Sequence, residues 1–346
     1  MQILILGGGV FVGASVLDAA LAGGHIVTVF NRGRSRSRWP DGVEVLIGDR
    51  GADLARLDAR RFDAVIDTCG YLPAELRTSV DALVHIGRYL FVSSVSAYAS
   101  FRVAPLRETA ALADAGGIDP ADRDPAHYGA QKAACEAIVR QAFVARATIV
   151  RPGLIVGPRD PTGRFSHWPW RSAAGGRMLV PAMPVPTRLQ CIDVRDLATW
   201  MVRLVEHDLP GEFNANGPVD TDGYGWAELI DGCAREVAAR GGTPAQPVRV
   251  AEAFLLEQGV APWSELPLWL PSTDPDYAGF MAIDVERARR AGLHTRPLRE
   301  TVRGVLDEPA PAEGERRAGK LTRSREAELL ASWDAGTPAR PGAGSE

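Results

Sequence analysis

An apolar run near the start of the chain breaks into clustered glycines, and a helical pattern begins directly after them. Residues 3–6 read Ile-Leu-Ile-Leu and are followed by Gly7, Gly8 and Gly9, with a further glycine at Gly13. Glycine lets a backbone turn tightly and approach phosphate groups, and the N-terminus of a helix offers unpaired N–H groups to negative charge. The sequence therefore predicts a strand, a turn and a helix that together hold the pyrophosphate of a dinucleotide.

The spacing of this motif departs from the usual one. It reads G-x-x-x-x-x-G, with Val10 where a middle glycine is often found. On this motif alone, a tight strand-to-helix turn without a ligand stays open as an alternative. The residues that we expect around the pyrophosphate are Gly7, Gly9, Val10, Phe11, Val12 and Gly13.

The first half of the chain alternates short apolar runs with amphipathic segments. Continuous Val, Ile and Leu runs with short connections are typical of a parallel sheet that is buried on both faces. The pattern predicts an α/β fold with a doubly wound parallel sheet, a Rossmann fold, and a small C-terminal substrate-binding region. The helix expected after the glycines covers Ala14–Ala22. The expected strands are Gln2–Leu6, Ile26–Phe30, Val43–Ile47, Ala64–Asp67, Tyr89–Val92 and Thr148–Arg151.

After about Gly153 this regular pattern loosens, and Pro, Trp and Gly become frequent. We expect residues 1–157 to form mainly the dinucleotide-binding core. Residues 158–308 should supply mainly substrate-binding loops and helices, with returning core elements such as a strand at Gly211–Asn216. Residues 309–346 should form a C-terminal extension with a short helix near Ser324–Trp333 and a disordered end.

Composition narrows the class of protein. The net charge is −4, which gives no electrostatic reason to expect nucleic acid as a partner. Four widely spaced cysteines, without a C-x-x-C pair or a nearby His cluster, predict free thiols in a reducing cytoplasm and no metal site. No apolar run is long enough to span a membrane, and a strand that starts at Gln2 predicts the absence of a signal peptide.

A tyrosine and a lysine stand four residues apart in a helical pattern, at Tyr128 and Lys132. This spacing puts both side chains on one face of a helix. A nearby ammonium favours the phenolate and lowers the pKa of a phenol toward the range useful for a general acid or base. The alternative is an exposed helix pair without a chemical role.

A buried strand at Leu90–Val92 ends in hydroxyl residues, at Ser93, Ser94 and Ser96. In an open parallel sheet, ligands bind beyond the carboxyl ends of the strands, so Ser94 is predicted to reach a substrate oxygen. For Ser93 and Ser96, capping of the following helix remains an equal alternative.

The order of these motifs resembles the extended or atypical short-chain dehydrogenase/reductase superfamily, of the NAD-dependent epimerase/dehydratase type. The resemblance covers residues 1 to about 306 and includes R-P-G-L-I-V-G-P at 151–158 and I-D-V-R-D-L-A at 192–198. It implies that Tyr128 is the catalytic acid/base, that Lys132 holds the ribose hydroxyls, and that Ser94 binds the reacting oxygen. It also implies cofactor contacts at Asp49, Thr68, Cys69, Gly70, Lys132, Pro152 and Gly153.

The end of the second expected strand points to the type of dinucleotide. The chain reads Phe-Asn-Arg-Gly-Arg-Ser-Arg at 30–36, without the acid that binds the 2′-hydroxyl of NAD. Arginines at this place favour a 2′-phosphate, so we expect NADP(H) rather than NAD(H). A solvated basic loop is the alternative. The expected contacts are Asn31, Arg32 as the main one, Arg34 and Arg36.

Two further features bear on the reaction. Val95 and Ser96 occupy the positions where similar sugar dehydratases carry an Asp-Glu pair, which argues against water elimination. Tryptophans in two loops predict a pocket for a flat or bulky apolar ligand, although they could equally pack the loops onto the sheet. The expected substrate contacts are Tyr71, Ser96, His167, Trp168, Trp170, Trp263 and Trp269.

The resemblance implies an NADPH-dependent reductase that transfers hydride to a C=O or C=N of a bulky small molecule. An Ala-, Arg- and Gly-rich chain of actinobacterial type suggests a specialised metabolite or antibiotic, in biosynthesis or resistance. The alternatives are a nucleotide-sugar epimerase with tightly bound NAD, and a non-enzymatic dinucleotide-sensing or RNA-associated protein. We expect a small-molecule substrate, no nucleic acid or membrane partner, and a monomer or homodimer.

Overall fold

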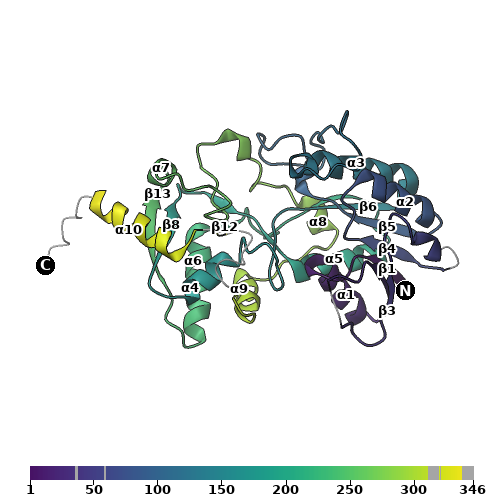
Figure 1. Cartoon of the computed structure of the whole chain (residues 1–346), viewed down its shortest axis with the longest axis horizontal. Helices are drawn as coiled ribbons and strands as arrows, with labels where there is room; N and C mark the ends of the chain where they lie inside the picture. The colour runs from purple at the N-terminus through teal and green to yellow at the C-terminus, as the bar shows by residue number, and fades with distance from the viewer. Residues whose placement is uncertain (36–37, 58–59, 311–318, 320, 337–346) are drawn as a thin grey trace. The chain divides into compact units, whose positions relative to one another are not determined.

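The computed structural model describes residues 1–35, 38–57, 60–310, 319 and 321–336. The chain divides into two compact units, each built from segments far apart in the sequence (Figure 1). Unit 1 comprises Met1–Arg159, Gln190–Gly223 and Pro275–Arg296, and unit 2 comprises Asp160–Leu189, Tyr224–Asp274 and Pro297–Glu346. The predicted contact Arg36 and the C-terminal end that we expected to be disordered lie outside the described residues.

Unit 1 is built on a parallel sheet. In the described part of the chain, seven strands follow the order β11-β6-β5-β4-β1-β2-β3, and all neighbours in it are parallel. This confirms the predicted doubly wound fold, with differences of one or two residues at the strand ends. The strands are β1 (Gln2–Leu6), β2 (Ile26–Asn31), β3 (Glu44–Ile47), β4 (Ala64–Asp67), β5 (Arg88–Val92), β6 (Ala147–Pro152) and β11 (Gly211–Ala215).

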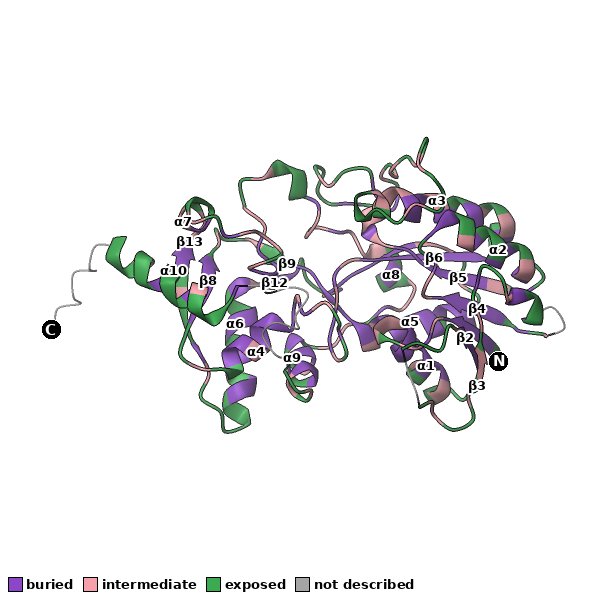
Figure 2. Ribbon diagram, in the orientation of Figure 1, coloured by how far each residue is buried: buried purple, intermediate pink, exposed green. Residues whose placement is uncertain are grey.

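Helices cover both faces of this sheet, because alternate residues of each strand point to opposite sides. Ile3 and Ile5 of β1 pack in one apolar cluster with residues of α1 and α5, whereas Leu4 and Leu6 pack in another with residues of α2 and α3. Burial is concentrated along the strands and the inner helix faces (Figure 2). The helices are α1 (Phe11–Ala22), α2 (Pro73–Leu83), α3 (Tyr128–Phe143), α5 (Val194–Glu206) and α8 (Glu286–Arg290).

Unit 2 has a smaller core around the parallel pair of β8 (Arg177–Ala182) and β13 (Gln246–Ala251). Its helices are α4 (His167–Ala173), α6 (Trp226–Ala239), α7 (Glu252–Glu257), α9 (Leu298–Leu306) and α10 (Arg323–Gly336). Helix α10 is the short C-terminal helix that the sequence predicted. Short two-residue strands complete the chain: β7 (Ile155–Val156) pairs with β10 (Ile192–Asp193), and β9 (Arg188–Leu189) pairs with β12 (Tyr224–Gly225).

Candidate functional site

The glycine turn lies between β1 and α1 and has no room for side chains. Gly7 and Gly8 have φ values of +110° and +77°, which favour glycine. A Cβ on Gly7 would lie 2.4 Å from Thr68 Oγ1, and one on Gly13 would lie 2.6 Å from the Gly8 nitrogen. The turn therefore presents bare backbone, as a pyrophosphate site requires.

Helix α1 begins directly at this turn, with Val10 as its N-cap and Phe11 as its first residue. The first N–H groups of a helix lack intrahelical partners and carry the positive end of its dipole. No acidic side chain lies in the first turn of α1 to compete for them. The arrangement of Val10, Phe11, Val12 and Gly13 thus fits an anionic group.

The carboxyl end of β2 carries donors for a second anion. Asn31 Oδ1 accepts the Gly33 N–H at 2.6 Å, while the buried Asn31 Nδ2 has no partner among the described residues. Arg32 and Arg34 are exposed and form no ion pair with any described residue. A Cβ on Gly9 would lie 2.2 Å from Ser35 Oγ, so the Ser35 hydroxyl lies against the glycine turn. This donor set fits a phosphate and contains no acid to bind a hydroxyl.

The last residue of β4, Asp67, forms a buried ion pair with Arg50 that the sequence did not predict. Arg50 Nη2 donates to Asp67 Oδ2 at 2.7 Å, and the Tyr89 hydroxyl donates to the same oxygen at 2.7 Å. Burial opposes the charge on Asp67, but Arg50 and these hydrogen bonds outweigh it and hold the Asp67 pKa below its ordinary value. In the sequence, the one hint of this pair is that Arg50 directly follows Asp49, which lies just after β3.

The residues after Asp67 line the same end of the sheet. Thr68 Oγ1 donates to the Leu6 carbonyl at 3.0 Å and so joins β4 to the glycine turn. Burial, followed by the nearby Asp67, raises the pKa of the Cys69 thiol to about 12. Cys69 therefore stays a neutral thiol at physiological pH.

Lys132 is buried on α3 and anchored to two strand ends. Its Nζ donates to the Gly70 carbonyl at 2.8 Å and to the Val92 carbonyl at 2.7 Å. Burial lowers the Lys132 pKa to about 8. Since an ammonium has three N–H groups, one remains for a further acceptor. The ring of the half-exposed Tyr71 lies 5.4 Å from this nitrogen.

Tyr128 is the first residue of α3 and is 37% exposed. The next residue explains how the helix comes so close to the end of β5, because a Cβ on Gly129 would lie 2.1 Å from the Ser96 carbonyl oxygen. Only glycine permits this approach. Gly129 was not among the predicted site residues, although a glycine directly after Tyr128 was visible in the sequence.

Replacing Gly129 with Ala should therefore displace the start of α3 from the Ser96 carbonyl. We expect a loss of about 1–3 kcal/mol in the free energy of unfolding, because the added methyl group meets backbone that cannot rotate away. Urea denaturation measures this change.

The control is the same substitution in helix α6, Gly232→Ala, where no described residue outside the neighbouring helix backbone comes within 4 Å of the added carbon. There alanine should stabilise the protein by about 0.5–1 kcal/mol. Equal effects at the two positions would contradict the close approach at Gly129.

The three serines after β5 have different roles. Ser94 caps the short helix η2 (Val95–Ala97), and its Oγ accepts the Ser96 N–H at 3.1 Å. Its hydroxyl hydrogen remains available to a ligand. Ser93 Oγ donates to Glu136 Oε1 at 2.6 Å. The capping role that we considered for Ser93 and Ser96 is therefore wrong for those residues and belongs to Ser94.

The chain leaves β6 through Pro152 and Gly153. The Gly153 N–H donates to the Ala215 carbonyl at 2.9 Å, and a Cβ on Gly153 would lie 2.4 Å from Asn216 Nδ2. The amide of Asn216 thus fills the space beside this turn, which also requires glycine.

Two of the predicted substrate contacts are core residues of unit 2. Trp168 and Trp269 are fully buried, and their indole N–H groups donate to the Pro267 carbonyl and to Glu252 Oε1. The prediction that they line a pocket is therefore wrong, because they pack the loops. His167 is 4% exposed and lies edge-to-face on Trp168. Trp170, Trp263, Tyr71 and Ser96 stay predictions.

The described part of the chain contains no cluster of three or more His, Cys, Asp or Glu side chains that could hold a metal ion. It also contains no helix with the length and apolar character needed to cross a membrane.

Comparisons with curated proteins found two relatives. The chain is 28% identical over 265 residues to the chloroplast stem-loop binding protein of 41 kDa b from Arabidopsis thaliana. The aligned region covers 70% of this chain and 64% of the relative. This chain is also 30% identical over 161 residues to 2′-dehydrokanamycin reductase from Streptomyces kanamyceticus. That aligned region covers 45% of this chain and 43% of the relative. The chain thus spans less than two thirds of either relative's length.

Solved structures share the fold. The Bordetella bronchiseptica enzyme WbmH, in complex with NAD⁺, matches 88% of this chain and 97% of its own, with a TM-score of 0.63 and 18% identity. The UDP-Glc/GlcNAc 4-epimerase from Campylobacter jejuni matches 88% and 98%, with a TM-score of 0.64 and 15% identity. The sequence model of the NAD dependent epimerase/dehydratase family matches residues 3–215. This range includes the glycine turn, the serine turn at residues 93–98, and α3, the helix that carries Tyr128 and Lys132. The chain belongs to the NAD dependent epimerase/dehydratase family.

Proposed function

We propose that this protein is an NADPH-dependent reductase that transfers hydride to a C=O or C=N group of a bulky small molecule. The observation that carries the proposal is the end of β2, where Arg32, Arg34 and Asn31 replace the acid that would bind a 2′-hydroxyl. The Nδ2 of Asn31 has no partner among the described residues. The similarity to 2′-dehydrokanamycin reductase supports reduction and a specialised metabolite as substrate. The four cysteines are free thiols, which supports a cytoplasmic protein, and we take it to be a monomer or homodimer.

The residues present fit the cofactor. The glycine turn and the start of α1 would hold its pyrophosphate, the end of β2 its 2′-phosphate, and Lys132 its nicotinamide ribose. Asp49, Thr68, Cys69 and Gly70 follow β3 and β4 and would contact the adenine side and the ribose, with Pro152 and Gly153 over the nicotinamide. When bound, the nicotinamide supplies the hydride.

The side chains of this protein supply the rest of the chemistry. Tyr128 donates its phenolic proton to the substrate oxygen, or to the nitrogen of a C=N group, as negative charge develops there. The buried ammonium of Lys132 stabilises the phenolate that remains on Tyr128. Ser94 donates its hydroxyl hydrogen to the same substrate atom and orients it, since its Oγ already accepts the Ser96 N–H.

Cofactor preference tests the proposal directly. NADPH should bind at least tenfold more tightly than NADH, and Arg32→Gln should weaken NADPH binding by about 10- to 100-fold while leaving NADH binding unchanged. These factors correspond to one charge-assisted hydrogen bond to a phosphate. Fluorescence titration of both cofactors measures the effect.

The matched control is Arg38→Gln, which removes a similarly exposed charge later in the same basic segment. Arg38→Gln should change NADPH affinity less than threefold, because salt screens an exposed charge that does not contact the phosphate. A preference for NADH in the unaltered protein would exclude NADPH as the cofactor.

A nucleotide-sugar epimerase is the second candidate, favoured by the family match and by the Tyr–Lys helix that both reactions would use. Purified protein that carries NAD and interconverts UDP-glucose and UDP-galactose without added cofactor would establish it. Oxidation of added NADPH with 2′-dehydrokanamycin or an aryl ketone as the probe would establish the reductase. Dinucleotide binding without either activity would instead favour a sensing or RNA-associated protein.

A further inference from the structure

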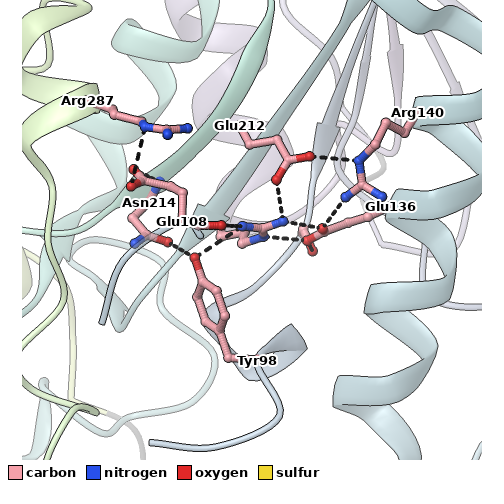
Figure 3. A network of polar contacts seen from close by, with 9 residues as sticks. Tyr98, Glu108, Glu136, Arg140, Glu212, Asn214 and Arg287 are labelled. Carbon is pink, nitrogen blue, oxygen red and sulfur yellow. Dashed lines mark hydrogen bonds and ion pairs between the residues drawn. The ribbon is translucent and has the colours of Figure 1, made fainter. Parts of the chain in front are cut away.

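We propose that Glu136 and Arg151 are positioning residues, and that their buried ion pair clamps both ends of the Ser94 turn against the helix that carries Tyr128 and Lys132. The inference rests on the proposed function for the roles of Ser94, Tyr128 and Lys132. Neither Glu136 nor Arg151 was predicted to support the site. Figure 3 shows the polar network around Glu136, with Tyr98, Glu212 and Arg140 labelled in it.

The first end of the turn is held by Glu136. This residue lies one helical turn after Lys132 on α3, and its Oε1 accepts the Ser93 hydroxyl at 2.6 Å. Ser93 directly precedes Ser94. The carboxylate therefore connects the catalytic helix to the entry of the serine turn.

The second end of the turn is held by Arg151. Its Nη1 donates to the Tyr98 hydroxyl at 3.1 Å, and that hydroxyl donates to Asn214 Oδ1 at 2.6 Å (Figure 3). Tyr98 directly follows η2, which Ser94 caps. The guanidinium therefore connects β6 to the exit of the same turn.

The two charges are held rigidly by each other. Arg151 Nε and Nη2 donate to the two oxygens of Glu136 at 2.9 and 2.7 Å, a bidentate pair. The remaining Arg151 hydrogens bind Tyr98, the Glu108 carbonyl and Glu212, so all five have acceptors.

Burial makes this arrangement costly to change. Glu136 and Arg151 are 0% and 1% exposed. A buried charge is tolerated only where it is paired and fully hydrogen-bonded, so each partner has a single favourable position. Rotation of either side chain would leave a charge in the interior, and the hydroxyls of Ser93 and Tyr98 are consequently fixed as well.

The outer part of the network does not touch the turn. Arg140 Nε donates to Glu212 Oε1 at 2.7 Å, and its Nη2 donates to Glu136 Oε2 at 3.2 Å (Figure 3). Arg140 is partly exposed, and among the described residues its side chain pairs with Glu136 and Glu212 rather than with Ser93 or Tyr98. It supplies a control within the same cluster.

The test removes one hydroxyl at a time, because removal of either buried charge risks unfolding. We expect Ser93→Ala and Tyr98→Phe to accelerate hydrogen exchange at least tenfold at the Ser96, Ala97 and Tyr98 amides, which close the turn. Ser93→Ala loses one buried hydrogen bond and Tyr98→Phe loses two. Exchange in α1 should stay unchanged. Arg140→Gln should leave hydrogen exchange in the turn unchanged. Ser93→Thr keeps a hydroxyl at this position and should retain the slow exchange of the unaltered protein.

The kinetic measurement follows the oxidation of NADPH with the aryl ketone as substrate, which we call the ketone probe. Both hydroxyl deletions should lower kcat at least fivefold while the KM for NADPH and its affinity stay within twofold, as expected when only the reacting geometry is lost. Unchanged exchange in the turn in both variants, or an equal acceleration throughout unit 1, would overturn the clamp. Absence of turnover in the unaltered protein would count against the reductase, whereas the exchange measurements would still decide the clamp.

Discussion

Tyr128→Phe is expected to lower turnover by about 100- to 10,000-fold, the range for loss of a positioned general acid or base. The substitution removes only the phenolic hydroxyl. Tyr128 is 37% exposed at the start of α3, so the loss of its hydroxyl leaves no enclosed cavity. NADPH oxidation with the ketone probe measures the rate, and fluorescence titration should show cofactor affinity within threefold of the unaltered protein.

The matched control is Tyr277→Phe, which deletes the same hydroxyl from another exposed tyrosine of unit 1 that we place outside the site. It should retain full turnover. If Tyr128→Phe keeps more than a tenth of the activity, Tyr128 is not the acid/base. If it loses cofactor binding together with activity, the role of Tyr128 is in binding rather than proton transfer.

Glu326→Gln is expected to lower the free energy of unfolding by about 3 kcal/mol, because it leaves the buried Arg171 without its counter-charge. Arg171 Nε donates to Glu326 Oε2 at 2.7 Å, and the Leu179 N–H donates to Glu326 Oε1 at 2.9 Å. Both side chains are nearly fully buried. This single carboxylate thus joins α10 to α4 and β8 within unit 2, and urea denaturation measures its contribution.

The control lies on the same helix. Asp334 forms a bidentate pair with Arg177, but both side chains are about half exposed. Solvent and salt screen such a pair, so Asp334→Asn should change stability far less than Glu326→Gln. Equal effects of the two substitutions would show that α10 contributes through helix stability and not through the buried contact.

The parallel sheet was predictable because its evidence is local in the sequence. The apolar runs at Gln2–Leu6 and Ala64–Asp67 coincide with β1 and β4, since strands buried on both faces require continuous apolar residues. The helical spacing of Tyr128 and Lys132 was predictable for the same reason, because residues four apart share a helix face whatever the rest of the chain does.

Burial, by contrast, could not be read from residue type. Trp168 and Trp269 look the same in the sequence as pocket-lining tryptophans, and only the core of unit 2 shows that they are fully enclosed. Ser93 and Ser94 are adjacent and chemically identical, yet one meets Glu136 and the other caps η2. Their difference depends on which segments fold against them.

By itself, therefore, the sequence determined the doubly wound sheet, the glycine turn, and the Tyr–Lys helix, all of which are encoded by spacing within one segment. The tertiary structure alone decided the close approach of Gly129 to Ser96 and the pairing of Glu136 with Arg151. Glu136 and Arg151 are far enough apart in the chain that no local period relates them, and each is an ordinary charged residue in its own segment. Only burial, which makes an unpaired charge too costly, selects one as the partner of the other.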